Sequence, residues 1–304
     1  MMYHQILSAF YSSTWAILPE KLADMRSFLR LKANGGEVSA EDVRTIMAAR
    51  RPDGVQMFGR VAVLPVFGVI SQRVGMMEEA SGGISTEKIG ATLDSLVVDN
   101  QVKAILMAFD SPGGSVAGVP ELAAKIRTAR DQKKVVAFAD PMAASAAYWL
   151  ASQASEIVVT PSGQIGSIGV ISGHDDITAA LERIGIKATL ITSAPYKSEG
   201  YPEVPLTDEA RAAMQEKVNH YHGMFVADIA KGRGVKASAV EKDFGQGRMI
   251  TAQDAVSRGM ADKIGTLEQT LKRLGADGSP ASIVVESITP KLAAYRARAV
   301  EILE

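Results

Sequence analysis

The chain of 304 residues contains no cysteine. This absence excludes disulfides, a thiol nucleophile and thiolate metal sites, and it is typical of proteins from reducing compartments. An excess of one charge is also absent, because 33 Lys and Arg residues stand against 34 Asp and Glu residues, which gives a net charge of −1. Nucleic-acid and anionic-membrane partners generally select a basic excess, so we expect neither.

Long apolar runs are missing as well. Residues 1–19 have no basic leader, and Ser and Thr interrupt their apolar residues. No run approaches the roughly 18 residues that a membrane-spanning helix needs. We therefore expect a protein that is neither secreted nor membrane-spanning.

The middle of the chain alternates between strand and helix patterns. Apolar runs predict strands at Val61–Ile70, Ala104–Phe109 and Lys133–Ala139, and an amphipathic pattern predicts a helix at Thr86–Val98. A further helix starts near Val119, where Pro120 occupies an early position. Such alternation is typical of an α/β fold with a mostly parallel sheet.

One serine stands out where the third of these strands gives way to a helix. Asp140 and Pro141 predict the end of the strand, and the alanine-rich run 143–152 predicts a helix that carries Ser145 near its start. Backbone N–H groups at such a position suit a nucleophile whose reaction develops an oxyanion. A serine among alanines is also a common packing residue, so this segment alone leaves both interpretations open.

A glycine pair follows the preceding strand. Residues 110–115 read Asp-Ser-Pro-Gly-Gly-Ser, which predicts a turn at Gly113 and Gly114. Glycines at the carboxyl end of a strand can present bare backbone N–H groups to a ligand, as an oxyanion hole requires. An ordinary connection between a strand and a helix would have a similar sequence.

Together, these motifs resemble the signal peptide peptidase A family of serine peptidases, peptidase family S49, which is related to the Clp protease and crotonase folds. The resemblance runs from about Val61 to Leu274. It also includes the segment 156–170, with its Gly-Ser-Ile-Gly-Val turn, and the segment 189–198 around Lys197. The implied fold is a Clp/crotonase-like stack of βαβ turns with a helical amino-terminal arm.

The resemblance implies a serine endopeptidase with a Ser-Lys dyad. Ser145 would be the nucleophile, Lys197 the general base and Ser167 a hydroxyl that orients the amine. The backbone N–H groups of Gly113 or Gly114 and of Ala146 would bind the oxyanion. Because a lysine has a reference pKa near 10.4, its base role requires burial to lower that pKa. Glu199, two residues beyond Lys197, could oppose this effect.

Within the family, the missing anchor and the segment from Trp15 to Leu22 look more like the phage branch, whose members act as capsid-assembly (prohead) proteases or minor head proteins. The resemblance then implies scaffold or capsid proteins as substrates, a homo-oligomeric ring, and the host cytoplasm or the prohead as the location. It implies no cofactor and no metal. The alternatives are a housekeeping peptidase of signal peptides or membrane fragments, a catalytically idle head protein, and acyl-CoA chemistry on the crotonase fold.

We expect three parts along the chain: a helical arm over residues 1–55, a peptidase domain over 56–274, and a linker with a final helix over 275–304. The segment from Val74 to Ile84 and the long helix after Thr207 are candidate oligomer contacts.

His220 and His222 point to different sides of that helix, which argues against a shared metal. Asp175, beside His174, is better explained as a helix cap than as part of a triad.

Overall fold

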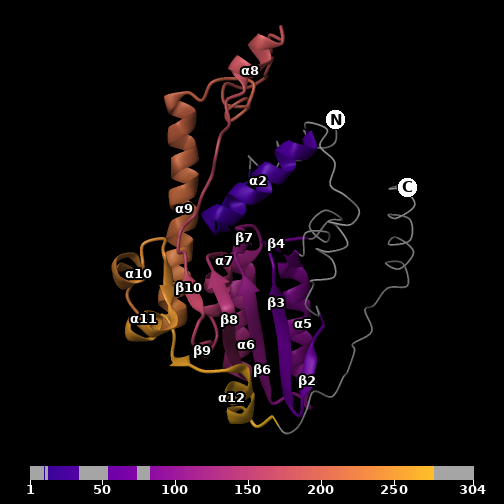
Figure 1. The fold of residues 1–304 in the computed structure, drawn as a ribbon, viewed down its shortest axis with the longest axis vertical. Coiled ribbons are helices and arrows are strands. Elements are labelled where there is room, and N and C mark those ends of the chain that lie inside the picture. Colours follow the sequence, from indigo (N-terminus) through magenta and orange to yellow (C-terminus); the bar gives the residue numbers. More distant parts are fainter. Residues whose placement is uncertain (1–9, 11–12, 34–53, 74–82, 277–304) are drawn as a thin grey trace, which may run out of the picture.

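The structure is a computed structural model, and it describes residue 10 and residues 13–33, 54–73 and 83–276 (Figure 1). Three predicted features lie largely outside the described residues. They are residues 34–53 of the predicted helical arm, the candidate oligomer contact that begins at Val74, and the final helix near the carboxyl end.

A large sheet forms the centre of the molecule, in the order β11-β10-β8-β6-β3-β2, with β9 beside β8 and β12 beside β9. The strands β3, β6, β8, β9, β10 and β12 pair in parallel, whereas β2 and β11 are antiparallel to their neighbours. The bounds are β2 Gln56–Phe58, β3 Val61–Phe67, β6 Ala104–Ser111, β8 Lys134–Ala144, β9 Glu156–Val159, β10 Gln164–Gly166, β11 Met249–Thr251 and β12 Lys263–Ile264. This arrangement confirms the predicted α/β class and its mostly parallel sheet.

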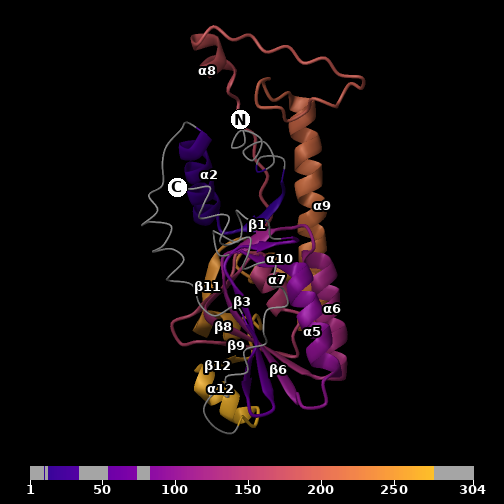
Figure 2. The same cartoon turned by 90° about the vertical axis from the view of Figure 1, so that its right-hand side faces the viewer.

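Helices cover both faces of this sheet, as the side view shows (Figure 2). One face packs against α5, α6, α7 and part of α9 through the larger apolar core, and the other packs against α12 through a smaller core that includes Leu271. The bounds are α2 Pro19–Ala33, α5 Thr86–Val98, α6 Val119–Gln132, α7 Ala146–Ala151, α8 Thr178–Arg183, α9 Asp208–Arg233, α10 Ala237–Asp243, α11 Ala252–Ser257 and α12 Leu267–Arg273. The predicted helices at Thr86 and Val119 are confirmed.

A second, small sheet lies at the carboxyl ends of the parallel strands. Its order is β1-β7-β4-β5, with bounds β1 Trp15–Ile17, β4 Ile70–Ser71, β5 Ile84–Ser85 and β7 Gly113–Ser115. The prediction of a plain turn at the glycine pair is therefore wrong, because both glycines lie in β7. There they are in register with Ala16 and Ile17 on one side, and Gly114 is in register with Ile70 on the other.

The strand that leads to Ser145 is longer than its sequence suggests. We expected Pro141 to end it, but β8 continues to Ala144 through a cis peptide bond between Asp140 and Pro141. The pairing of β6 with β8 passes from Phe109↔Ala139 to Ser111↔Ala143, which leaves extra residues on β8 around the proline. A local irregularity of this kind accommodates a residue that lacks an N–H group.

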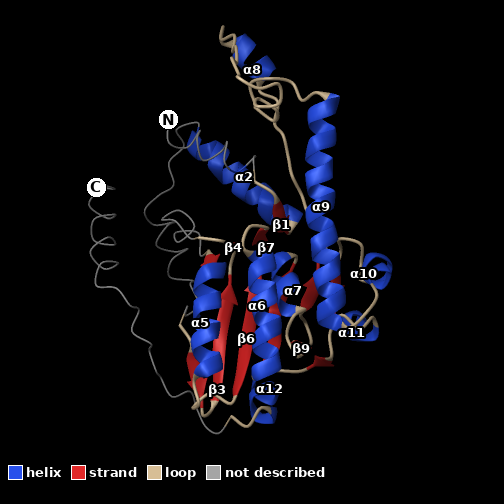
Figure 3. Cartoon of the chain, turned by 180° about the vertical axis from the view of Figure 1, so that it is seen from behind, coloured by secondary structure: helices blue, strands red, loops and turns tan. Residues whose placement is uncertain are grey.

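The long helix α9 begins as predicted, since the Thr207 side chain accepts a hydrogen bond from the N–H of Ala210 at 3.1 Å. Its carboxyl-terminal part packs on the core through Phe225, Val226 and Ile229. Its other end projects away from the sheets toward α8 (Figures 1 and 3). We call residues 177–207, between the core and α9, the distal segment. Among the described residues, no helix is both long and apolar enough to cross a membrane.

An ion pair anchors the carboxyl-terminal end of α9 to the sheet. Arg233 donates to both carboxylate oxygens of Asp262 at 2.9 and 2.8 Å, and the N–H of Ile157 donates to the same carboxylate at 2.7 Å. Burial alone would raise the pKa of Asp262, but the hydrogen bonds from Arg233 and Ile157 outweigh it and hold the pKa below its ordinary value.

Replacing Asp262 with asparagine should therefore destabilise the fold at neutral pH. The Asp262 side chain is 36% exposed, so we expect a loss of about 2 kcal/mol rather than the larger cost of a fully buried pair. A carboxylate whose pKa is lower in the folded state stabilises the protein above a pH of about 4 and loses this effect as the pH falls through the folded value. Denaturant unfolding at several pH values measures the difference.

Asp94 provides a matched control, because its carboxylate pairs with Lys125 on the surface. The variant Asp94→Asn should lose less than about 0.5 kcal/mol at any pH. Equal losses in the two variants, or a loss in Asp262→Asn that does not shrink below pH 4, would contradict the role of this ion pair.

Candidate active site

Ser145 lies in the connection between β8 and α7, in an unusual backbone conformation. Its φ and ψ angles are 55° and −117°, in a region that residues with a side chain rarely adopt. Its N–H donates to the carbonyl oxygen of Gly166 at 2.7 Å, and its carbonyl oxygen accepts from the N–H of Trp149 at 2.9 Å. Backbone strain that is held by hydrogen bonds on both sides is typical of functional positions.

The helix that follows Ser145 begins later than predicted. We expected a helix over residues 143–152, whereas α7 spans Ala146–Ala151, with Ser145 as the residue before its first turn. The side chains of Tyr148 and Trp149 anchor this short helix to neighbouring segments. The Tyr148 hydroxyl donates to the carbonyl oxygen of Met260 at 2.9 Å, and Trp149 donates to the Asp228 carboxylate at 2.9 Å. The serine therefore sits on a rigid, buried support.

The glycine pair lies next to this serine. A Cβ atom on Gly113 would stand 3.0 Å from the carbonyl oxygen of Ala144, the residue before Ser145, and 2.2 Å from that of Ala16. A Cβ atom on Gly114 would stand 1.8 Å from the carbonyl oxygen of Ile70. Gly113 also has a φ of 98°, which favours glycine. No other residue type fits either position without movement of the neighbouring backbone.

Ser111 is a residue of this site to which the sequence assigned no role. Its hydroxyl donates to the carbonyl oxygen of Gly68 at 2.6 Å and accepts from the N–H of Gly113 at 3.2 Å. The Ser111 hydroxyl thus orients the Gly113 peptide and, in this conformation, itself accepts from the N–H that is a predicted oxyanion donor. Ser111 is completely buried at the end of β6. In the sequence, its place directly before Pro112 and the glycine pair is the signal that could have indicated such a role.

Ser167 belongs to the same group of residues. It follows β10, which pairs with the end of β8 so that Gly166 is in register with Ala144. Ser167 is 5% exposed, has a φ of 52°, and donates its N–H to the carbonyl oxygen of Arg248 at 2.9 Å. The structure therefore brings together Ser145, Gly113, Gly114, Ala146 and Ser167.

The structure does not bring Lys197 to this group. Lys197 is exposed and lies in the distal segment. That segment includes α8 and lies near the end of α9 that is farther from the sheets, whereas α7 packs within the core (Figures 1 and 3). Within one copy of the chain, the predicted nucleophile and the predicted base therefore stand apart.

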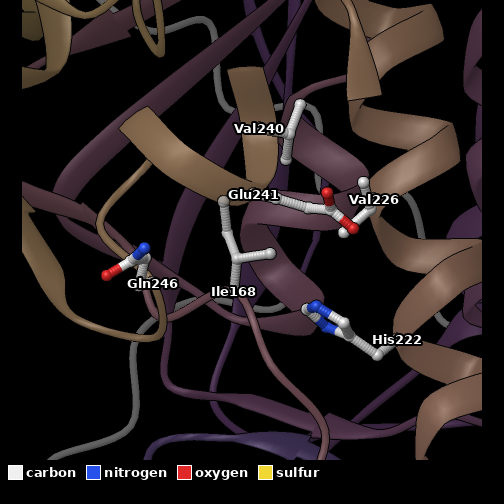
Figure 4. Close-up of a pocket in the computed structure, with 6 residues that line it drawn as sticks. All are labelled: Ile168, His222, Val226, Val240, Glu241 and Gln246. Carbon is white, nitrogen blue, oxygen red and sulfur yellow. The ribbon is translucent and has the colours of Figure 1, made fainter. Parts of the chain in front are cut away.

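A cavity of about 320 Å³ lies beside the Ser167 turn. Its lining includes Ile168, Val226 and Val240, and the side chains of His222 and Glu241 also point toward it (Figure 4). Both α9 and α10 contribute one apolar and one polar side chain to the walls. A small apolar side chain of a bound peptide would fit such a space.

The neighbouring carboxylates Asp175 and Asp176 have different partners. The prediction that Asp175 caps a helix is wrong, because its carboxylate binds Arg26, at 2.8 Å, and Arg30, both on α2. Asp176 instead accepts from the N–H of Thr178 at 2.9 Å. Among the described residues, no group of three or more His, Asp or Glu side chains is arranged to hold a metal ion.

Comparisons with known proteins identify relatives of the chain. Residues 127–278 match the family described as peptidase family S49. The chain is 34% identical over 215 residues to capsid assembly protease C of Escherichia phage lambda, which covers 71% of this chain and 48% of that protein. It is 32% identical over 192 residues to a putative protease, slr0021, of Synechocystis, which covers 62% of this chain and 69% of that protein.

A third relative belongs to another branch. The putative signal peptide peptidase SppA of Enterococcus faecium is 32% identical over 185 residues, which cover 60% of this chain and 53% of that protein. The chain spans about half the length of the curated phage relatives that it matches. From the matched family and from these identities, the chain belongs to peptidase family S49.

Proposed function

We propose that the chain is a serine endopeptidase that cleaves polypeptides through Ser145. The observation that carries this proposal is the strained backbone of Ser145, with a φ of 55°, directly beside a glycine pair that accepts no side chain. A hydroxyl-bearing residue in such a conformation, next to glycine backbone N–H groups, suits acyl transfer. The Clp/crotonase-like arrangement that the resemblance implies belongs to the same proposal.

In this mechanism, the Ser145 hydroxyl oxygen attacks the carbonyl carbon of the scissile bond, and its proton moves to a neutral lysine amine. The N–H groups of Gly113 or Gly114 and of Ala146 bind the oxyanion. The lysine then returns the proton to the leaving amine, and a water molecule hydrolyses the acyl-enzyme by the same steps. Ser111 orients the Gly113 peptide, and Ser167 would orient the amine.

We propose further that the base is Lys197 of a second copy of the chain. Lys197 is exposed and far from Ser145 in its own copy, and the distal segment around it exposes six large apolar or aromatic side chains: Ile177, Ile184, Ile186, Ile191, Tyr196 and Tyr201. Ile191 is 96% exposed. Several exposed apolar side chains in one segment are typical of an interaction site, and a neighbouring copy would cover them. Covering would also remove the lysine from water, as its role requires.

For the substrate, we favour scaffold or capsid proteins during phage head assembly, because phage relatives at 34% identity are named as a capsid assembly protease and a head-tail preconnector protein. The second candidate is a peptidase of signal peptides or membrane fragments, which the SppA relative favours. Incubating the protein with an unfolded capsid-type polypeptide and with a signal peptide, and comparing kcat/KM, distinguishes the two. Cleavage of neither would contradict the proposed function.

The pH dependence of cleavage tests the identity of the base. A lysine base is active only in its neutral form, so kcat/KM should rise with pH above 7. The profile should show no rise centred near pH 6.5, which is where a histidine base would titrate. The variant His222→Gln, which changes the histidine of the cavity beside Ile168, should leave this profile unchanged. A limb near 6.5 that disappears in this variant would transfer the role of base to His222.

A further inference from the structure

The strand β1 is paired on both of its edges. On one edge it is antiparallel to β7, with Trp15, Ala16 and Ile17 in register with Ser115, Gly114 and Gly113. On the other edge, Trp15 and Ile171 exchange two backbone hydrogen bonds of 2.8 Å each. Three residues of the amino-terminal part of the chain thus fill a slot between β7 and residues 169–171.

This slot is the candidate active site itself. The carbonyl oxygen of Ala16 lies against Gly113, where a Cβ atom would be only 2.2 Å away. On the opposite wall, the hydroxyl of Ser145 donates to the carbonyl oxygen of Gly169 at 3.5 Å. Ser145 and Ala16 are both completely buried. An incoming chain could not reach the serine while β1 stays in place.

The walls of the slot recognise backbone more than side chains. Two unpaired edges would accept any extended segment through its N–H and C=O groups, which is how added strands bind to sheets. Gly113 of β7 lacks the side chain that would otherwise hold such a segment at a distance. Ala16 and Ile17 are buried there and Trp15 is half-buried. The slot therefore suits an extended polypeptide with small and apolar side chains.

The geometry points to a peptide-binding site that the chain fills with its own residues Trp15–Ile17, which must leave before an extended polypeptide can bind. The inference rests on the proposed function for what happens to a bound polypeptide, but the exchange of strands is a binding event and can be measured without cleavage. The segment 13–18 thereby acts as an internal competitor for the site.

Besides its strand pairing, β1 is held by contacts at its two ends. The Trp15 indole donates to the carbonyl oxygen of Phe10 at 3.1 Å, and the two rings lie 5.1 Å apart. At the other end, the N–H of Leu18 donates to the carbonyl oxygen of Pro112 at 2.9 Å. Removing the Trp15 ring should therefore weaken the internal strand without changing the walls of the slot.

A designed disulfide can lock β1 in place. Backbone hydrogen bonds join Val116 to Thr14 and Leu18 to Pro112 in this ladder, and because bonded pairs alternate in antiparallel strands, Trp15 and Ser115 form a non-bonded pair with Cα atoms about 4.5 Å apart. This spacing suits a disulfide. Since the chain has no cysteine, the double variant Trp15→Cys/Ser115→Cys contains only the designed pair.

The experiment uses the full chain with these two changes and Ser145→Ala, which prevents cleavage. A fluorescent peptide with the sequence of residues 13–20 is titrated, and its polarisation is measured under oxidising and reducing conditions. We expect the reduced protein to bind at least about tenfold more tightly than the oxidised protein, because apparent affinity follows the fraction of open sites. The matched control is the single variant Trp15→Cys, whose binding should not change with the redox condition.

A second peptide, with proline in place of Ala16, lacks a backbone N–H group inside the slot and should bind more weakly to the reduced protein. Equal binding in the oxidised and reduced states, or no binding in either, would overturn the inference. A disulfide that links two copies rather than closing within one would overturn the assignment of β1 to its own slot. Cleavage by the protein with an intact Ser145 is measured separately, so a failure of the proposed function would not be mistaken for a failure of strand exchange.

Discussion

The variant Ser145→Ala is expected to lose peptide cleavage almost completely, with kcat/KM on an unfolded polypeptide lower by about 10,000-fold or more. The substitution removes the one oxygen that would attack the substrate. It should leave the fold intact, because alanine keeps the Cβ atom and the removed hydroxyl makes only a 3.5 Å contact with the carbonyl oxygen of Gly169. That distance is at the outer limit of a hydrogen bond.

Ser152 is the matched control, since it is completely buried at the other end of α7 and its hydroxyl donates to the carbonyl oxygen of Trp149 at 2.7 Å. The variant Ser152→Ala should lower the free energy of unfolding by about 1 kcal/mol and keep its activity. Thermal unfolding and turnover are measured on both variants. Activity in Ser145→Ala close to that of the wild type would rule out Ser145 as the nucleophile.

The second large effect concerns Lys197 and the assembly of two copies. The variant Lys197→Ala should be as inactive as Ser145→Ala, and Lys197→Arg should not restore activity, because a guanidinium stays protonated at any usable pH. If the base comes from a neighbouring copy, mixing the two inactive variants should restore cleavage. With random mixing, about one quarter of the sites combine an intact serine with an intact lysine.

This experiment separates the two ways of building the dyad. Recovery of about one quarter of the wild-type activity indicates that the serine and the lysine come from different copies. No recovery, under conditions where light scattering shows that the variants assemble together, would place both residues in one copy. The distal segment would then have to fold back onto its own core. Full activity of Lys197→Ala alone would exclude this lysine as the base.

Local sequence patterns predicted the elements whose bounds depend on local signals. Thr86–Val98 became α5 at the predicted bounds, because Ser85 caps its start, accepting from the N–H of Lys88, and its apolar residues face one side. Thr207 likewise marked the start of α9. Caps and helical periodicity act over a few residues, so the sequence alone contains the information.

Pairing between distant segments could not be predicted in the same way. The glycine pair looks like a turn in isolation, and only its neighbours Ala16 and Ile70 make it a strand. Pro141 would end most strands, but the shifted pairing of β8 with β6 accommodates it. Asp175 looked like a cap, yet Arg26 and Arg30, roughly 150 residues earlier in the chain, bind it. Each of these outcomes depends on tertiary contacts rather than on local propensity.

The candidate site shows the same division. Ser145, Gly113 and Ser167 carry recognisable motifs, and the structure gathers them at the carboxyl ends of β8, β6 and β10. The strand β1 was expected to be part of a separate arm, and no local pattern indicated that it lies across the glycine pair. The sequence also could not predict that Lys197 is exposed in the distal segment, away from Ser145 of its own copy, because the placement of that segment depends on tertiary contacts rather than on a local pattern.

The central claim, that Ser145 is the nucleophile of a peptidase, is tested most directly by active-site labelling. The wild type, the variant Trp15→Cys with its weakened β1, Ser145→Ala and Ser152→Ala are incubated with a fluorophosphonate probe, digested and mapped by mass spectrometry. We predict label on Ser145 in the wild type and in Ser152→Ala, faster labelling in Trp15→Cys, and none in Ser145→Ala. Label on another residue, or no label even in Trp15→Cys, would contradict the claim.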